Sequence, residues 1–150
     1  MDTPHPSWVF SSWQFWALAS AGFAALTAVF AKLGVAEINS DFATFLRTAI
    51  ILMILGGIVL ATGQVQSLAD LSGRGLAFLV LSALATGASW LCYFRALKLG
   101  DAARVAPVDK FSVVLVAVFG AAFLGEKLSL LNWAGVALIA AGIILVAAKI

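Results

Sequence analysis

Five long apolar segments take up most of this chain and constrain its fold more than any other feature. They cover residues 13–35, 42–62, 74–97, 105–124 and 130–149. About 20 apolar residues in an α-helix span the hydrocarbon core of a bilayer. Because the segments are continuously apolar, they predict helices and not the alternating strands of a membrane barrel. We therefore expect an all-α integral membrane protein with five transmembrane helices.

The composition agrees with a chain that lies mainly in lipid. Only 11% of the 150 residues are charged and 63% are hydrophobic, whereas soluble domains average about 25% charged residues. This excludes a soluble enzyme, a nucleic-acid-binding module and a disordered tail. The single cysteine, Cys92, cannot form an intrachain bridge, so a disulfide scaffold is excluded as well.

The segments between the apolar runs are short, so we expect one five-helix membrane domain over residues 13–150, preceded by a tail of residues 1–12. The tail contains no Lys or Arg, and the first apolar run is long for the core of a signal peptide. We expect that run to be a retained helix.

Five crossings place the two termini on opposite sides of the membrane. Seven Lys and Arg residues lie nearer the C-terminal side and two nearer the N-terminal side, which favours a cytoplasmic C-terminus. Four of the seven lie within apolar runs, and without them the count is three against two. Insertion in both orientations therefore stays open. Trp13, Trp16 and Trp133 fall near the N-terminal side, and Trp90 and Tyr93 towards the C-terminal side, where we expect their rings at headgroup level.

Charged residues inside the apolar runs all lie towards the C-terminal side. A charge at the centre of a membrane costs about 2.5–3.5 kcal/mol on the insertion scale, so such residues mark function by default. Long basic side chains can instead reach the headgroups, which is the interpretation we favour for Arg95. The remaining charged residues, which we take as candidates for substrate contact or gating, are Lys32, Arg47, Asp109 and Lys110.

Asp109 has two interpretations. It follows Pro107, which suits a first helical turn, where the helix dipole would stabilise a carboxylate. Alternatively, it pairs with Arg47 or Lys32 at matching depth, and this network lines a polar vestibule. Because neighbouring helical residues point about 100° apart, we expect Asp109 and Lys110 to face different ways.

A row of polar side chains follows one face of the third predicted helix at i, i+4, i+7 and i+11 spacing. Its members are Ser82, Thr86, Ser89 and Tyr93. Hydroxyl groups in membrane helices often only join helices together. The other interpretation makes these residues candidates for the wall of a substrate path, and the sequence leaves both open.

Small residues mark the last helix, where Gly135 and Gly142 stand seven positions apart. Small faces let helices approach closely in lipid, so these two glycines are candidates for a dimer interface. The pattern does not distinguish packing within one chain from packing between chains.

No catalytic or cofactor pattern is present in the sequence. The one histidine, His5, lies in the tail, and we find no Ser-His or Cys-His partnership. A phosphate-binding loop and metal-ligand spacing are also absent. We therefore expect neither an enzyme nor a bound cofactor or metal, while coupling to a proton or another ion stays open.

Several stretches, taken together, resemble the EamA-type transporters of the drug/metabolite transporter superfamily. Residues 93–110 resemble the junction of the family's third and fourth helices. Residues 105–114, which overlap this stretch, most resemble the same region in the family's short five-helix branch. Residues 30–34, 43–48 and 123–129 resemble the family's first helix end, second helix start and last hairpin. The motifs are loose, but their order covers nearly the whole chain.

Larger family members have ten helices in two inverted five-helix repeats. The resemblance therefore implies that this chain pairs with a second copy, antiparallel, to rebuild a ten-helix transporter. Residues 135–143 look like the glycine-spaced last helix that pairs the small multidrug resistance proteins. Those relatives use a Glu in helix 1 for proton/drug exchange, and helix 1 here has no acid.

From these observations we expect a homodimeric secondary transporter of a small metabolite, working by alternating access in the plasma membrane, which is the inner membrane in a bacterium. The four candidate charges comprise three cations and one anion, which favours an anionic or zwitterionic substrate. A passive channel and a non-transporting membrane accessory subunit are the alternatives, and no nucleic-acid partner is expected.

Overall fold

The computed structural model describes residues 12–67 and 70–148. Within these residues the chain forms helices and no strands; five spans are long and apolar enough to cross a membrane. The expected all-α fold with five transmembrane helices is therefore confirmed. The helices are α2 (Trp13–Val35), α3 (Ser40–Ala61), α4 (Gly73–Leu99), α5 (Ala102–Asp109), α6 (Ser112–Phe123) and α7 (Leu130–Ala147).

Polar N-caps fix where four of these helices begin. A Ser or Asn side chain at each start accepts a hydrogen bond from a backbone N–H of the first turn, which has no partner inside the helix. The hydropathy pattern overlooks such polar first turns, which is why α3 begins two residues before its predicted start. The caps are Ser12, Asn39, Ser72 and Ser129.

The fourth span, predicted as one helix, is interrupted between α5 and α6. Pro107 lies inside α5 and cannot donate a backbone hydrogen bond. Two residues beyond α5 the chain tightens, and the Phe111 N–H bonds to the Val108 carbonyl at 3.0 Å, three residues back. The Lys110 carbonyl accepts from Val113 N at 2.9 Å. The backbone at the break therefore keeps the hydrogen bonds that a lipid environment demands.

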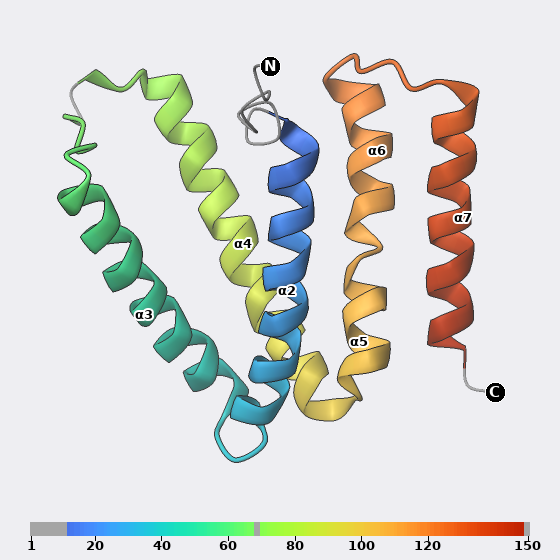
Figure 1. Cartoon of the computed structure of the whole chain (residues 1–150), viewed down its shortest axis with the longest axis horizontal. Coiled ribbons are helices and arrows are strands. Elements are labelled where there is room, and N and C mark those ends of the chain that lie inside the picture. The colour runs from blue at the N-terminus through green and yellow to red at the C-terminus, as the bar shows by residue number, and fades with distance from the viewer. Residues whose placement is uncertain (1–11, 68–69, 149–150) are drawn as a thin grey trace, which may run out of the picture.

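The ends of α2, α3, α4 and α5 come together at the C-terminal side and α3 leans away towards the N-terminal side, whereas α6 and α7 run side by side (Figure 1). α2 packs on α3, α4 and α5, whereas α7 packs on α5 and α6. The buried core lies at the converging end, where Val35 and Leu97 are 0% exposed. Ala31, Ala43 and Phe94 complete it. The chain is thus held together at one end.

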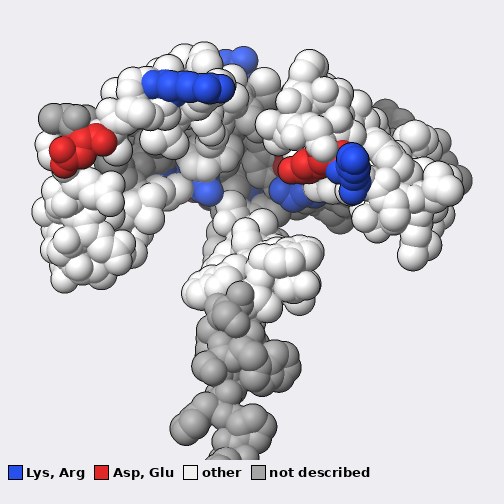
Figure 2. All heavy atoms as spheres, turned by 90° about the horizontal axis from the view of Figure 1, so that it is seen from above, with Lys and Arg blue, Asp and Glu red and all other residues white. Residues whose placement is uncertain are grey.

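Much of the helical surface is left uncovered by the chain itself. Its accessible surface is 11833 Å², whereas a compact soluble protein of 15.6 kDa exposes about 7,000 Å². Figure 2 shows a curved, mostly uncharged surface, with charged side chains at its rim and basic atoms deeper in the hollow. Lipid or another chain has to cover the apolar remainder.

The hairpin between α6 and α7 turns at Gly125, whose φ of 70° lies in the left-handed region. Gly125→Ala should destabilise the protein by about 1–2 kcal/mol, because an L side chain is strained at that φ. Thermal unfolding in mild detergent measures the change.

The matched control is Gly22→Ala in the middle of α2, where an added Cβ meets nothing within 4 Å. That variant should be neutral or more stable, because Ala is the better helix former. Equal melting temperatures for the two variants would contradict this account of the hairpin.

Candidate substrate cavity

A polar cavity of about 340 Å³ opens among four of the five spans, beside the break between α5 and α6. We call it the central cavity. Charged, aromatic and hydroxyl side chains share its wall. They are Arg47, Asp109 and Lys110, then Trp90, Tyr93 and Phe94, then Thr27, Ser89 and Ser112, with Ala24 completing the lining.

Arg47 lies half-buried on the α3 side of the central cavity. Its guanidinium carbon is 4.4 Å from the centre of the Trp90 ring and 5.7 Å from that of Phe94. A cation over an aromatic face is attracted by the ring quadrupole. The two rings of α4 therefore hold Arg47 in place inside the membrane.

Asp109 and Lys110 both line the central cavity, so the expectation that they face different ways is wrong. The helix ends at Asp109, and the Lys110 stem curls back to place Nζ 3.3 Å from Asp109 Oδ2. The expected ion pair between Asp109 and Arg47 or Lys32 is not formed. The vestibule is present, but its charges are partnered differently.

The helix-dipole interpretation of Asp109 is also wrong. Pro107 is not in a first turn, because α5 already begins at Ala102. Asp109 is the last residue of α5, at the negative end of that helix's dipole. Its environment is the cavity and the neighbouring ammonium.

Lys32 lies apart from the other candidate charges and does not line the central cavity. Its Nζ donates hydrogen bonds to the carbonyl oxygens of Leu97 at 2.7 Å and Gly100 at 2.9 Å. Carbonyls at a helix C-terminus have no partner within the helix. Lys32 therefore ties the end of α4 to α2.

Arg95 does not simply reach for the headgroups, as the sequence suggested. It forms a bidentate ion pair with Asp41, through Nε–Oδ1 at 2.9 Å and Nη2–Oδ2 at 2.7 Å. The two side chains are 60% and 46% exposed. Asp41 escaped the sequence analysis because it was placed in the loop before the second helix. Nearby, Lys98 Nζ donates to the Ile38 carbonyl at 2.6 Å.

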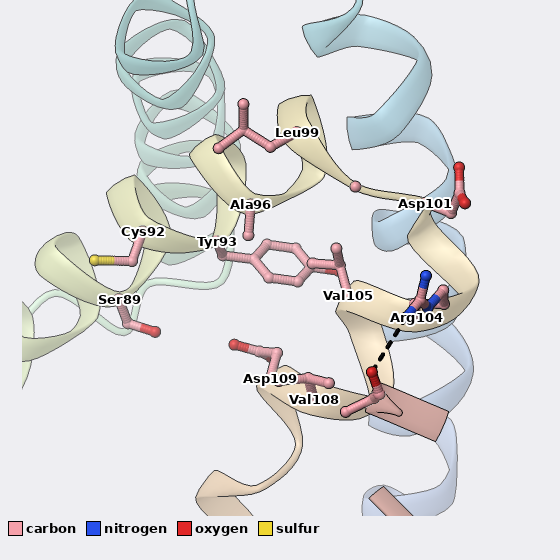
Figure 3. A pocket seen from close by; sticks show the side chains of 12 residues that line it. Ser89, Cys92, Tyr93, Ala96, Leu99, Asp101, Arg104, Val105, Val108 and Asp109 are labelled. Atoms are coloured by element: carbon pink, nitrogen blue, oxygen red, sulfur yellow. Dashed lines mark hydrogen bonds between the residues drawn. The ribbon is translucent and has the colours of Figure 1, made fainter. Parts of the chain in front are cut away.

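A second cavity of about 540 Å³, here the outer cavity, lies between α4, α5 and the end of α7. Ser89, Tyr93 and Asp109 line both it and the central cavity. In Figure 3 the Ser89 hydroxyl and the Asp109 carboxylate point toward one another, and the Tyr93 ring extends from α4 toward Val105. These three side chains form the partition between the two spaces.

Arg104, also at the outer cavity, donates from Nη2 to the Ala147 carbonyl at 3.1 Å, the dashed contact in Figure 3.

A third cavity, of about 380 Å³, lies between α2 and α3 and shares Thr27, Arg47 and Phe94 with the central one. The central cavity thus has a neighbour on either side.

Only the C-terminal half of the predicted hydroxyl row faces these spaces. Ser89 and Tyr93 line the central cavity, whereas Ser82 and Thr86 line none of the three. The Thr86 hydroxyl donates to the Ser82 carbonyl at 2.9 Å within α4. The role of all four in a substrate path stays a prediction.

Trp90 is the cavity residue that sequence reasoning missed. We expected its ring at the headgroups, but it lies under Arg47 in the central cavity, and Tyr93 lines that cavity too. One feature of the sequence could have revealed it: Trp90 on the third predicted span lies at about the same membrane depth as Arg47 on the second, where a cation and an aromatic ring can meet.

The glycines of α7 face open space in this chain. An added Cβ at Gly135 or Gly142 would meet no atom within 4 Å. The open face leaves room for another helix, and the interface with a second copy stays a prediction.

The membrane-spanning fold with its internal polar cavity defines a multi-pass membrane transport protein. The description "EamA-like transporter family" matches residues 11–148, and the chain belongs to this family. Transport, not enzymatic catalysis, is the activity of that class.

A protein from a Sinorhizobium species, named "Uncharacterized transporter in cobO 3'region", is 70% identical over 136 residues. The match covers 91% of this chain and 96% of that relative, so the two sequences align over nearly their whole lengths. No solved structure matches the chain. The family resemblance seen in the sequence is confirmed.

Replacement of Lys32 separates a structural role from a role in transport. Lys32→Gln should lower the free energy of unfolding by about 1–3 kcal/mol, because two carbonyls at the end of α4 lose a charged donor. Chemical or thermal unfolding of the detergent-solubilised protein measures this.

Lys127→Gln removes the same charge from the exposed turn between α6 and α7 and should shift stability by less than about 0.5 kcal/mol. If Lys32→Gln abolished uptake while leaving stability unchanged, Lys32 would belong to the substrate path instead.

Proposed function

We propose that this chain is one half of a homodimeric secondary transporter that moves a small metabolite across the plasma membrane by alternating access. The observation that carries the proposal is the central cavity, where Arg47, Asp109 and Lys110 meet the rings of α4 at membrane depth. Charged groups placed there at a cost in free energy are typical of substrate paths. In a bacterium this membrane would be the inner one.

In an antiparallel pair, the second chain would cover apolar surface that one chain leaves exposed. Residues 13–150 form one unit in this proposal, with residues 1–12 as a tail, and two units complete a ten-helix transporter. The uncovered surface of the chain and the open glycine face of α7 support a partner of similar chemistry. Inverted repeats around a shared midplane site are a common transporter design.

Alternating access is supported by the contacts between α3 and α4, which join these helices on the C-terminal side. On the C-terminal side, the Arg95–Asp41 pair and the bond from Lys98 to Ile38 join α4 to the start of α3. An exposed ion pair such as Arg95–Asp41 contributes only about 0–1 kcal/mol, so it can open without unfolding the helices. The N-terminal side, where α3 leans away, would be the side open in this state.

The count of basic residues leaves both orientations open, as an antiparallel pair requires, because four of those nearer the C-terminal side lie within the spans. Six Lys and Arg residues lie nearer that side and two nearer the other, among residues 12–67 and 70–148; Lys149 lies outside the described residues. Of the three charged residues that line the central cavity, Arg47 and Lys110 are cations and Asp109 is an anion, which supports an anionic or zwitterionic substrate.

Flux through reconstituted protein tests the transporter against its alternatives. Proteoliposomes assayed with a panel of radiolabelled organic acids and amino acids should show saturable uptake and counterflow of at least one of them, because a transporter carries a limited number of molecules per cycle. Non-saturable flux without counterflow would indicate a passive channel. Flux that appears only with a foreign subunit would indicate an accessory role.

The dimer is tested by crowding the glycine face of α7. Gly142→Leu should weaken self-association in lipid by about 1–3 kcal/mol, because overpacked contacts cost that much, with little effect on helix content. Energy transfer between labelled chains in vesicles measures association.

Gly57→Leu in α3, where an added Cβ also meets nothing within 4 Å, is the matched control and should leave association unchanged. Labelling of each terminus from both sides of the membrane adds the orientation of the pair. A single orientation in dimers would rule out the antiparallel arrangement.

A further inference from the structure

We infer that Arg47, which lies over the Trp90 ring, is the anion-binding element of the central cavity, and that the substrate is an organic monoanion with a carboxylate on an apolar or aromatic body. This inference rests on the proposed function and narrows it. Four observations carry it: the free donors of Arg47, the charge balance of the cavity, the composition of its wall and its size.

The hydrogen-bond donors of Arg47 are unused. Its guanidinium makes no hydrogen bond or ion pair with any residue that the structure describes, although it is half-buried in a membrane span. A guanidinium that lies over an aromatic ring keeps its in-plane N–H groups free. These groups form a planar fork that matches the two oxygens of a carboxylate.

The charge balance of the cavity favours a single negative charge. Lys110 Nζ lies 3.3 Å from Asp109 Oδ2, so these two charges offset one another. Among the described residues that line the cavity, Arg47 is the cation without an ionic partner. A zwitterion would bring an ammonium group as well, and the carboxylate that could accept it is already paired.

The rest of the wall suits an apolar or aromatic body. Trp90, Tyr93 and Phe94 contribute rings, and Ala24 contributes a small apolar surface. A volume of about 340 Å³ lies at the lower end of ligand pockets, so it suits a molecule of about a dozen non-hydrogen atoms. Trp90 is a positioning residue here, because it acts on the substrate through Arg47.

Three matched probes test the inference on the purified full chain in lipid nanodiscs. They are 3-phenylpropionate, its neutral amide 3-phenylpropanamide, and L-phenylalanine, which adds an ammonium to the same skeleton. By isothermal titration calorimetry the wild type should bind 3-phenylpropionate at least about 10-fold more tightly than either of the others. Equal affinity for the three, or no binding of any, would overturn the inference.

Two variants of Arg47 distinguish the bidentate geometry of its guanidinium from its positive charge. Arg47→Gln should bring the affinities for 3-phenylpropionate and its amide together while binding of the amide stays measurable, which a merely unfolded protein could not do. Arg47→Lys keeps the charge but loses the bidentate geometry, so binding of 3-phenylpropionate should weaken about 10-fold. Unchanged binding in both variants would place the anion elsewhere.

The role of Trp90 is tested by keeping or removing its ring. Trp90→Phe should stay within about 3-fold of the wild type, whereas Trp90→Leu should lose about 10-fold, because the cation loses its aromatic support. Arg74→Gln is the control: Arg74 lies 5.8 Å from the Phe78 ring but lines none of the three cavities, so binding should not change. Equal losses in all three variants would overturn the role of Trp90.

Flux measurements distinguish a failure of this inference from a failure of the proposed function. If 3-phenylpropionate binds with the expected selectivity but no probe is ever transported, the site stands and the transporter proposal fails. If saturable flux is found but the carboxylate has no advantage over the amide, the transporter stands and the anion site is refuted.

Discussion

The structure depends on cations that satisfy backbone carbonyls at the C-terminal ends of its helices. Carbonyls there have no intrahelical partner. Lys32 bonds to the carbonyls that end α4, and Arg104 bonds to the carbonyl of Ala147 at the end of α7. Lys98 does the same for Ile38 in the loop before α3. Together with the buried core around Val35 and Leu97, these bonds join the helices on the C-terminal side.

The same bonds divide the basic residues of that side into two groups. Lys32, Lys98 and Arg104 serve main-chain carbonyls, and Arg95 serves Asp41. Among the described basic residues of that side, Arg47 and Lys110 remain, and both line the central cavity. The excess of positive charge, which the sequence presents as a sign of orientation, is therefore in part a structural requirement of helix ends, and in part a feature of the cavity.

Hydropathy predicted the spans well, because each helix must by itself be long and apolar enough to cross the bilayer. These two properties can be read from the sequence without knowing how the helices pack. The site was only partly predictable. Arg47, Asp109, Ser89 and Tyr93 were singled out and line one cavity, since charge and spacing are visible in a sequence. The partners of Lys32 are carbonyls, which every residue carries, so no pattern reveals them. Trp90 was assigned to the headgroups because composition cannot separate a ring at an interface from a ring beneath a cation.

The break at residues 110–111 lies where two groups of helices meet. α5 packs on α2, α4 and α7, whereas α6 packs substantially only on α7. Bonds to carbonyls three residues back keep the break satisfied, so a change of angle there would expose no unpaired backbone group to lipid. In the proposed transporter, movement of α6 relative to α5 would pass through this point. Asp109 and Lys110 flank it, which would connect the occupancy of the cavity to the angle of the fourth span.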